Sequence, residues 1–369
     1  MKRKVFDMIK LKNNKHFIST YDSSLLYGIA ILLMVFHHCF SVPDQLNYDY
    51  IPVLGGFDVE ARIAWQGKVC VALYAFISGY AFSVISEKNS EEKFGSRFKV
   101  DLWTSLRQLI KFYLKFWIAF FVFVPMGIIW FGKSAAIKDI ISCFFLGRGG
   151  YNPSWWYVWQ YIKFLMAYPF IETLITYRKE KRTWIICLTG ILFIAGCRAF
   201  AWNTVAGKLT GIAINQFCSE YMIIFITAFV IGKGLVYERI SGRMQHDLLW
   251  AVILLTGSFA IRWFYVTEAG QSDIDVLITP FLVFSLVTLF HKGKEKNALK
   301  SMLHFWGKHS TYIWLNHAFW ILYYFQKIVL LPRYSLLIYL WALLLSLLTS
   351  MVLAWLHLHL VKPISGMNK

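Results

Sequence analysis

Long apolar stretches alternate along the chain with short polar stretches that are mostly basic. Ten apolar stretches are close to the roughly 20 residues that a helix needs to cross about 30 Å of hydrocarbon, where a helix satisfies its own backbone polar groups. The pattern predicts an all-α fold, a polytopic membrane bundle of about ten transmembrane helices. These helices are expected at Ser23 to Ser41, Gly67 to Ser86, Leu109 to Phe131, Trp155 to Thr176, Trp184 to Ala201, Ser219 to Val236, Leu248 to Val266, Asp275 to His291, His309 to Leu330 and Ser335 to Leu360.

The distribution of Lys and Arg predicts the topology. Short loops rich in positive charge stay on the cytoplasmic side of a membrane. With both the N- and the C-terminus in the cytoplasm, the inner segments hold 24 basic residues and the outer loops hold 6. This alternation supports the count of ten, because one helix more or fewer would exchange the two sides.

Composition agrees with lipid as the solvent. The chain of 369 residues is 58% apolar and 16% charged, whereas soluble domains are about half apolar and about a quarter charged. The net charge of +18 is spread over cytoplasmic loops, which indicates attraction to anionic membrane lipid and no nucleic acid partner. The six cysteines show no CxxC or His-linked spacing, so no metal is expected.

No soluble domain fits between the predicted helices. The longer connections are an acidic outer segment from Val42 to Gln66, an inner segment from Glu87 to Gln108 and an outer segment from Gly132 to Ser154. We therefore expect one integral-membrane domain over residues 1–369, with a basic cytoplasmic N-terminus at 1–22 and a short cytoplasmic tail at 361–369. The expected location is the cell membrane, the inner or plasma membrane of a bacterium.

Two adjacent histidines, His37 and His38, lie toward the outer end of the first predicted helix. An ionisable side chain inside a span is costly and is a functional hypothesis by default. Neighbouring helical residues point about 100° apart, so the two imidazoles cannot serve one site equally. A buried neutral imidazole accepts a proton near pH 7, as a general base must. The alternative is a hydrogen-bonded pair that holds helices together.

Four basic residues lie within or just before the third and fourth predicted helices. Arg107, Lys111 and Lys115 are spaced by four residues, which places them along one helical face where the third helix leaves the cytoplasm. Such a row suits the phosphates of a cytoplasmic cofactor, although snorkelling at the interface explains it too. Lys163 lies deeper, in the fourth helix, and is a further candidate for binding this cofactor.

Other polar side chains lie near the outer ends of later helices. Arg198 and Arg262 are candidates for an acceptor site, or for pairing with an acid such as Glu220. In the ninth predicted helix, Ser310, Tyr312 and His317 are either part of a site or structural hydrogen-bonding groups between helices.

The outer sequence GRGGYNPSWW combines flexible glycines with Tyr151, Trp155 and Trp156. Flat aromatic side chains at a membrane surface either anchor a helix or stack against sugar rings. The three residues are therefore candidates for binding a glycan, with anchoring as the alternative for at least one tryptophan.

Four segments together resemble the membrane-bound acyltransferase-3 family. They are YDSSLLYGIAILLMVFHH in the first helix, YAFISGYAF with Ser78 in the second, WWYVWQYIKFLMAYPFI in the fourth and GKHSTYIWLNHAFW in the ninth. The family's first-helix motif is a basic residue, ten intervening residues and a functional His, which favours His38 over His37. The chain departs from this motif because Tyr27 occupies the basic position, and its basic cluster is matched only in part by Arg107 and Lys111.

The resemblance implies transfer of an acyl group, usually acetyl, from cytoplasmic acetyl-CoA or another acyl-CoA to a hydroxyl of a polysaccharide or lipid-linked glycan at the cell surface. His38 is then the general base or a transient acyl carrier, and the Arg107 row engages the phosphates of CoA. Some relatives carry an extracytoplasmic transferase domain, which this chain lacks, so it acts alone or with a separate partner protein.

A transporter or flippase that moves a lipid-linked sugar or polysaccharide without acyl transfer is the main alternative. It would share the helices, the aromatic loop and the intramembrane charges. Paired Gly- or Pro-interrupted helices in two related halves are typical of such transporters, and no such symmetry is visible in this sequence.

Overall fold

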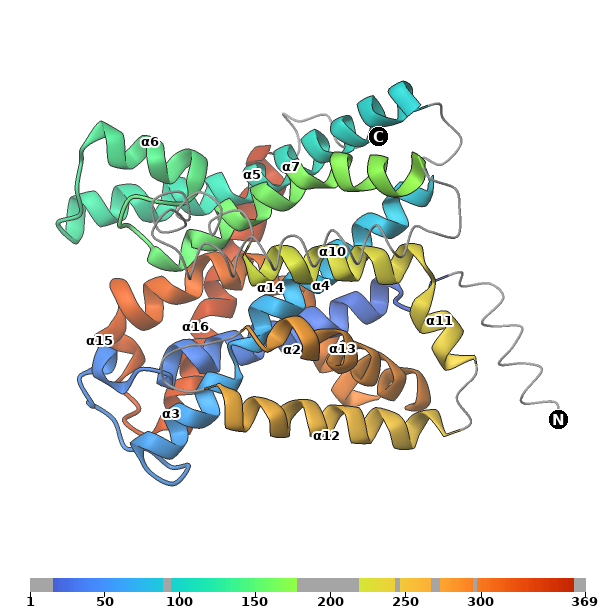
Figure 1. Ribbon diagram of the computed structural model, residues 1–369. Coiled ribbons are helices and arrows are strands. Elements are labelled where there is room, and N and C mark those ends of the chain that lie inside the picture. The colour runs from blue at the N-terminus through green and yellow to red at the C-terminus, as the bar shows by residue number, and fades with distance from the viewer. Residues whose placement is uncertain are drawn as a thin grey trace, which may run out of the picture.

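The structure is a computed structural model that describes residues 16–88, 94–177, 219–242, 246–266, 273–294 and 297–361. This part of the chain is helical, with one isolated bridge between Ile51 and Tyr334 (Figure 1). The elements, in chain order, are α2 (Thr20–Phe40), η1 (Pro43–Leu46), α3 (Phe57–Gln66), α4 (Val69–Lys88), α5 (Phe94–Trp130), α6 (Ile137–Leu146), η2 (Pro153–Trp155), α7 (Trp156–Tyr177), α10 (Glu220–Lys233), α11 (Val236–Ser241), α12 (Asp247–Tyr265), α13 (Asp275–Lys292), α14 (Ala298–Ala318), η3 (Phe319–Tyr323), α15 (Gln326–Val329), α16 (Ser335–Leu356) and η4 (His357–Val361).

The helical membrane fold predicted from the sequence is confirmed in the described residues. Each predicted apolar segment coincides with a helix except Trp184 to Ala201, which lies outside the described residues. Within the described ranges, six helices are long and apolar enough to cross a membrane, namely Thr20–Phe40, Phe57–Glu87, Ser96–Trp130, Asp247–Tyr265, Asp275–Lys292 and Ser335–Val361. The total of ten crossings and the cytoplasmic position of the two termini stay predictions.

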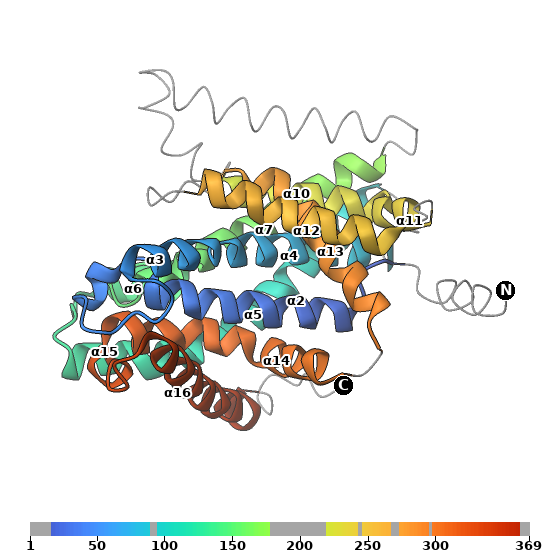
Figure 2. The same ribbon diagram turned by 90° about the horizontal axis from the view of Figure 1, so that it is seen from below.

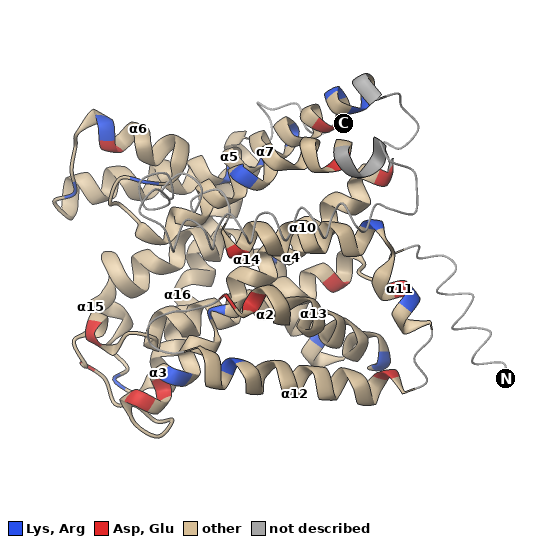
Figure 3. Cartoon of the chain, viewed as in Figure 1, with Lys and Arg blue, Asp and Glu red and all other residues tan. Residues whose placement is uncertain are grey.

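Helix α2 lies in the middle of the bundle, between α4 and α14. Helices α10 and α13 pack on α4, α12 packs on α13, and α16 packs on the other side of α14, so the helices form stacked layers (Figure 2). Long stretches of helix carry no charged residue, and acidic residues gather around α3 (Figure 3). This arrangement encloses the polar faces of α2 and α14 within apolar layers.

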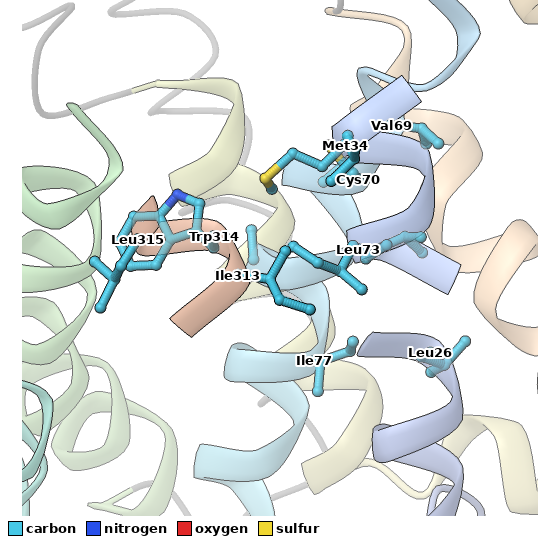
Figure 4. Packing of buried hydrophobic residues seen from close by; sticks show 14 of the residues in the cluster. Leu26, Met34, Val69, Cys70, Leu73, Ile77, Ile313, Trp314 and Leu315 are labelled. Atoms are coloured by element: carbon cyan, nitrogen blue, oxygen red, sulfur yellow. The ribbon is translucent and has the colours of Figure 1, made fainter. Parts of the chain in front are cut away.

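The apolar core fills the spaces between these central helices. Leu26 and Met34 of α2, Leu73 of α4 and Ile313 of α14 are buried side chains that pack at the junction of the three helices (Figure 4). Their burial in the described structure positions three helices that also carry polar residues, described below.

A capping box fixes the start of α2. The Ser19 hydroxyl accepts from the Asp22 backbone N–H at 3.1 Å, and the Asp22 carboxylate accepts from the Ser19 backbone N–H at 2.9 Å. Such caps satisfy donors that have no partner within the helix. Asp22 also pairs with His291 of α13 at 3.1 Å, so the cap ties the start of α2 to a neighbouring helix.

Three of the predicted connections are more ordered than expected. The segment from Val42 to Gln66 contains α3, the segment from Gly132 to Ser154 contains α6, and most of the inner segment from Glu87 to Gln108 belongs to α5. Side-chain pairing explains the extension of α5, because buried Arg97 forms an ion pair with Glu172 of α7. Glu172 also accepts from Lys233 of α10 at 3.0 Å, so a buried charge cluster joins three helices there.

Helix α14 begins and ends earlier than the expected segment from His309 to Leu330. Its N-cap is Asn297, whose side chain accepts from the Lys300 backbone N–H at 2.8 Å. After Ala318 the backbone widens into one π-helical turn, η3. The apolar pattern missed the first half of α14 because this half carries several polar and basic residues.

Helices α2 and α14 approach each other through glycines. A Cβ atom added to Gly28 would lie 2.1 Å from the carbonyl oxygen of Leu303, and one added to Gly307 would lie 1.9 Å from that of Ser24. Both distances are far below a normal contact, so only glycine permits this backbone separation. Small residues at helix crossings serve the same purpose widely in membrane proteins.

Replacing Gly307 with Ala is therefore expected to force α2 and α14 apart and to lower stability by about 1–3 kcal/mol, the usual cost of overpacking. Thermal unfolding of the purified protein in detergent measures the change. Gly257→Ala in α12 is the matched control, because nothing lies within 4 Å of its added Cβ. Equal melting temperatures for both variants would contradict the proposed close contact.

Candidate active site

One large cavity opens among α2, α4, α5, α7 and α14, with a volume of about 860 Å³. It brings together side chains that lie far apart in the sequence. Of the residues predicted to form a site, those that line it are Tyr27, His37, His38, Ser78, Lys111, Lys115, Trp156, Ser310 and His317. The cavity is large enough for a cofactor-sized molecule.

Helix α2 presents its polar residues to the cavity along one face. Tyr27 and His38 are eleven residues apart, which is about three turns or roughly 16 Å of helix. Both line the cavity, with Tyr27 toward one end and His38 toward the other. The Tyr27 ring lies 5.2 Å from that of Tyr74 on α4. The first helix therefore runs along the cavity and does not merely close one end.

The imidazole of His38 on α2 lies beside a second imidazole, which belongs to α14. Its ring centroid lies 4.8 Å from that of His317 on α14, and the rings are inclined by 72°. His38 is partly exposed to the cavity, whereas His317 is completely buried. His317 Nδ1 lies 3.1 Å from the Ile313 carbonyl oxygen and 2.8 Å from that of Trp314.

His37 lines the same end of the cavity but is held by the backbone. Its Nδ1 lies 3.0 Å from the carbonyl oxygen of Ala64, which can only accept a hydrogen bond. Its ring centroid is 5.1 Å from the ring of Trp65. One of its two nitrogens is thus committed to the last turn of α3, which leaves His38 as the better placed of the two for chemistry in the cavity.

Lysines line the cavity, and in the described part of the chain no Asp or Glu does. Lys111 and Lys115 of α5 were predicted from the sequence; Lys68, in the turn before α4, and Lys308 of α14 were not. Lys308 follows Gly307, which packs on Ser24, so it lies near the Tyr27 end. An anionic ligand suits this surface because cations are the natural partners of phosphate oxygens.

Two other basic residues predicted to bind a cofactor lie elsewhere. Arg107 is exposed, with its guanidinium 5.3 Å from the ring centre of Trp103. Helical geometry gives the reason, since two steps of four residues rotate the side chain by about 80° in total. Lys163 is buried in α7 and is not among the residues that line the cavity.

The three aromatic residues predicted in the loop before α7 have different roles: two are buried in the protein and one lines the cavity. Trp155 is fully buried, and its indole N–H donates to the Leu315 carbonyl at 2.9 Å. Tyr151 is also buried, donates to the Ser134 carbonyl at 2.5 Å, and has a pKa raised by burial. Trp156 is exposed and lines the cavity. Of the three candidates for sugar stacking, Trp156 alone has its ring open for it.

Arg262 forms a buried ion pair with Asp275 of α13 and not with Glu220. It also donates to the backbone carbonyls of Trp65 and Gln66. These contacts hold the turn whose Ala64 carbonyl contacts His37. Arg262 therefore lies behind the cavity and supports its wall.

Tyr312 is a predicted site residue that does not line the cavity. Tyr312 is buried and packs near His357, with 6.3 Å between their ring centroids. Arg198 lies outside the described residues. Cys39 and Cys70 are both buried free thiols.

The residues missed at first follow a helical pattern that the sequence does contain. On α14 the lining residues are Gly307, Lys308, Ser310, Thr311, Trp314 and His317. Their spacing of three or four residues defines one face. Polar residues recurring at this spacing were the available signal for Lys308. On α5 the same spacing groups Gln108 with Lys111 and Lys115 and leaves Arg107 aside.

The fold and the site together define a multi-pass membrane protein whose helical bundle encloses a cavity lined by histidines and lysines. A family profile described as an acyltransferase domain matches residues 22–358, which is nearly the whole chain. The chain belongs to this acyltransferase-3 family, as its motifs led us to expect. No curated protein and no solved structure matches it.

Loss of the Arg262 charge is expected to destabilise the protein strongly. In Arg262→Met the Asp275 carboxylate stays buried without its partner, which typically costs about 3–5 kcal/mol. The double variant Arg262→Met/Asp275→Asn removes both charges and should recover part of this loss. Thermal unfolding in detergent measures both. A double variant no more stable than the single one would argue against the ion pair as the cause.

Proposed function

We propose that the protein transfers an acetyl group from cytoplasmic acyl-CoA to a hydroxyl of a polysaccharide or glycan on the other side of the membrane. The observation that carries this proposal is that one cavity holds both a pair of imidazoles and a set of lysines. The first suits proton transfer from a hydroxyl, and the second suits an anionic donor. Membership of the acyltransferase family supports the same reaction class.

The donor site is assigned to the Tyr27 end of the cavity. Under the predicted topology the start of α2 is cytoplasmic, and Lys308 lies near this end. Lys111 of α5 also lines the cavity. Its neighbour in the sequence, Phe112, has its ring centroid 6.2 Å from that of Trp314 on α14. Lys308 thus provides positive charge near Tyr27, the position where the family motif has a basic residue, and Lys111 adds positive charge to the same cavity. Ammonium groups there would hold the phosphates of CoA.

His38 acts at the far end of the cavity. As the acceptor hydroxyl approaches the thioester, a lone pair of the His38 imidazole takes the hydroxyl proton. The hydroxyl oxygen forms a bond to the acyl carbon, the carbon–sulfur bond breaks, and its electron pair leaves on the sulfur of CoA. The proton on His38 then passes to this thiolate, so that the products are the ester and free CoA and the imidazole is neutral again.

The glycan is assigned to the rim near Trp156. This side chain is exposed, lines the cavity and stands at the start of α7. A flat aromatic face provides a stacking surface for a sugar ring. The same cavity would serve a lipid-linked glycan or a polysaccharide, because the chemistry requires only a reachable hydroxyl.

Removal of the imidazole of His38 tests the proposal directly. His38→Ala should lower transfer of radioactive acetyl from acetyl-CoA to glycan by about 10²–10⁴-fold, the usual contribution of a general base. The expression level and melting temperature should stay close to those of the parent. Full activity in this variant would exclude His38 as the base. Transport of glycan without any acetylation by the parent protein would identify a transporter instead.

The donor assignment predicts a change in KM. Lys111→Gln should raise KM for acetyl-CoA roughly ten- to hundred-fold, the equivalent of one hydrogen bond to a charged group. Lys99→Gln is the matched control, because Lys99 lies on the same helix, is exposed and does not line the cavity. Initial rates at varied acetyl-CoA concentration give both constants. An equal effect of the two substitutions would reject a specific contact.

A further inference from the structure

The hydrogen bonds of His317 define which of its ring nitrogens carries the proton. Nδ1 contacts the carbonyl oxygens of Ile313 and Trp314 at 3.1 and 2.8 Å. A carbonyl oxygen only accepts, so Nδ1 must be the donor. A neutral imidazole has one N–H, and Nε2 of His317 therefore carries the lone pair.

That lone pair is buried without a protein partner in the described structure. His317 has no exposed surface, and its Nε2 makes no hydrogen bond among the described residues. A buried polar atom in this state calls for an explanation, because nearly all such atoms are paired. The adjacent imidazole is that of His38, at 4.8 Å between ring centroids.

The backbone around His317 is fixed from two sides. The Asn316 amide donates to the Ser346 carbonyl of α16 at 3.1 Å. Trp155 donates to the Leu315 carbonyl from the opposite side at 2.9 Å. Helix α14 then widens into the π-helical turn η3 two residues later. His317 therefore stands on a rigid support, as a residue that orients another side chain requires.

A histidine base usually has a carboxylate or carbonyl partner that fixes its tautomer. The described cavity lining contains no Asp or Glu. We infer that His317 takes this role as a positioning residue, its Nε2 accepting the N–H of His38. His38 is thereby held in the tautomer whose other nitrogen is a lone pair directed at the acceptor hydroxyl. This inference rests on the proposed function and adds the group that orients its base.

The proton balance of the reaction stays as described above. The hydroxyl proton moves to His38, and the resulting imidazolium donates one N–H to the His317 lone pair while it exists. His317 itself neither gains nor loses a proton. It orients the base and stabilises the charge that forms on it.

Kinetics of two substitutions test this role. His317→Phe keeps a ring of similar size and lacks both nitrogens, whereas His317→Gln can return an amide oxygen near the position of Nε2. We expect His317→Phe to lower kcat by about 10²-fold or more, with KM for acetyl-CoA changed less than about twofold. His317→Gln should retain clearly more activity. Unchanged kcat in the Phe variant, or equal losses in both, would overturn the inference.

Nitrogen NMR gives a readout that does not depend on activity. In protein labelled with ¹⁵N in its histidine rings, the His38 signals are identified by their loss in His38→Gln. We expect one neutral tautomer for His38 in the parent and in His317→Gln, and a mixture in His317→Phe. The signals of His304, which does not line the cavity, should stay constant and serve as the control.

The two experiments separate this inference from the proposed function. An unaltered His38 tautomer in His317→Phe overturns the inference even if the parent is an active acetyltransferase. A shift to mixed tautomers supports the histidine pair even if the parent protein transfers no acetyl group, in which case the proposed function fails. Folding of each variant is checked by its elution as a monodisperse species in detergent.

Discussion

The direct contact of α2 with α14 is the constraint on which the rest of the structure depends. Gly28 and Gly307 let the two backbones meet. From each glycine the chain advances ten residues, about 15 Å of helix, to His38 and to His317 respectively. Because the two helices run side by side in the same direction, they bring both imidazoles to the same height. The histidine pair is thus a consequence of where two glycines cross.

Periodicity in the sequence was enough to predict the helical bundle and part of the site. The resemblance to the family singled out His38, and helical spacing placed Lys111 and Lys115 on a face that does line the cavity. Periodicity failed for Arg107 because intervals of four residues drift around a helix of 3.6 residues per turn. It also failed for Lys308, whose neighbours are too polar for the first half of α14 to stand out as apolar. A hydropathy profile detects helices that face lipid. It detects least well a helix that lies inside the bundle and carries polar residues.

In other cases the sequence could not identify which residue a side chain contacts. Arg262 was expected to serve an acceptor site or to pair with an acid such as Glu220, and its partner Asp275 became evident only once α12 and α13 were seen to pack together. Trp155 and Trp156 are neighbours with the same chemistry, yet one donates to α14 inside the protein and the other faces the cavity. A rotation of about 100° between successive residues separates these roles. Tertiary contacts decide which residue points inward, and no local pattern contains them.

The charge of the cavity bears on the choice between transfer and transport. Lys111, Lys115 and Lys308 line the described cavity, and under the proposed function their positive charge attracts an anionic acyl donor. In the proposed reaction this attraction holds the charged part of the donor, while its thioester reaches the imidazoles. In the proposed reaction the same positive potential would stabilise the negative charge that forms on the attacking oxygen and on the departing sulfur, where preorganised charges are most effective. Passage of a neutral glycan would gain nothing from these lysines, so their presence beside a base favours acyl transfer.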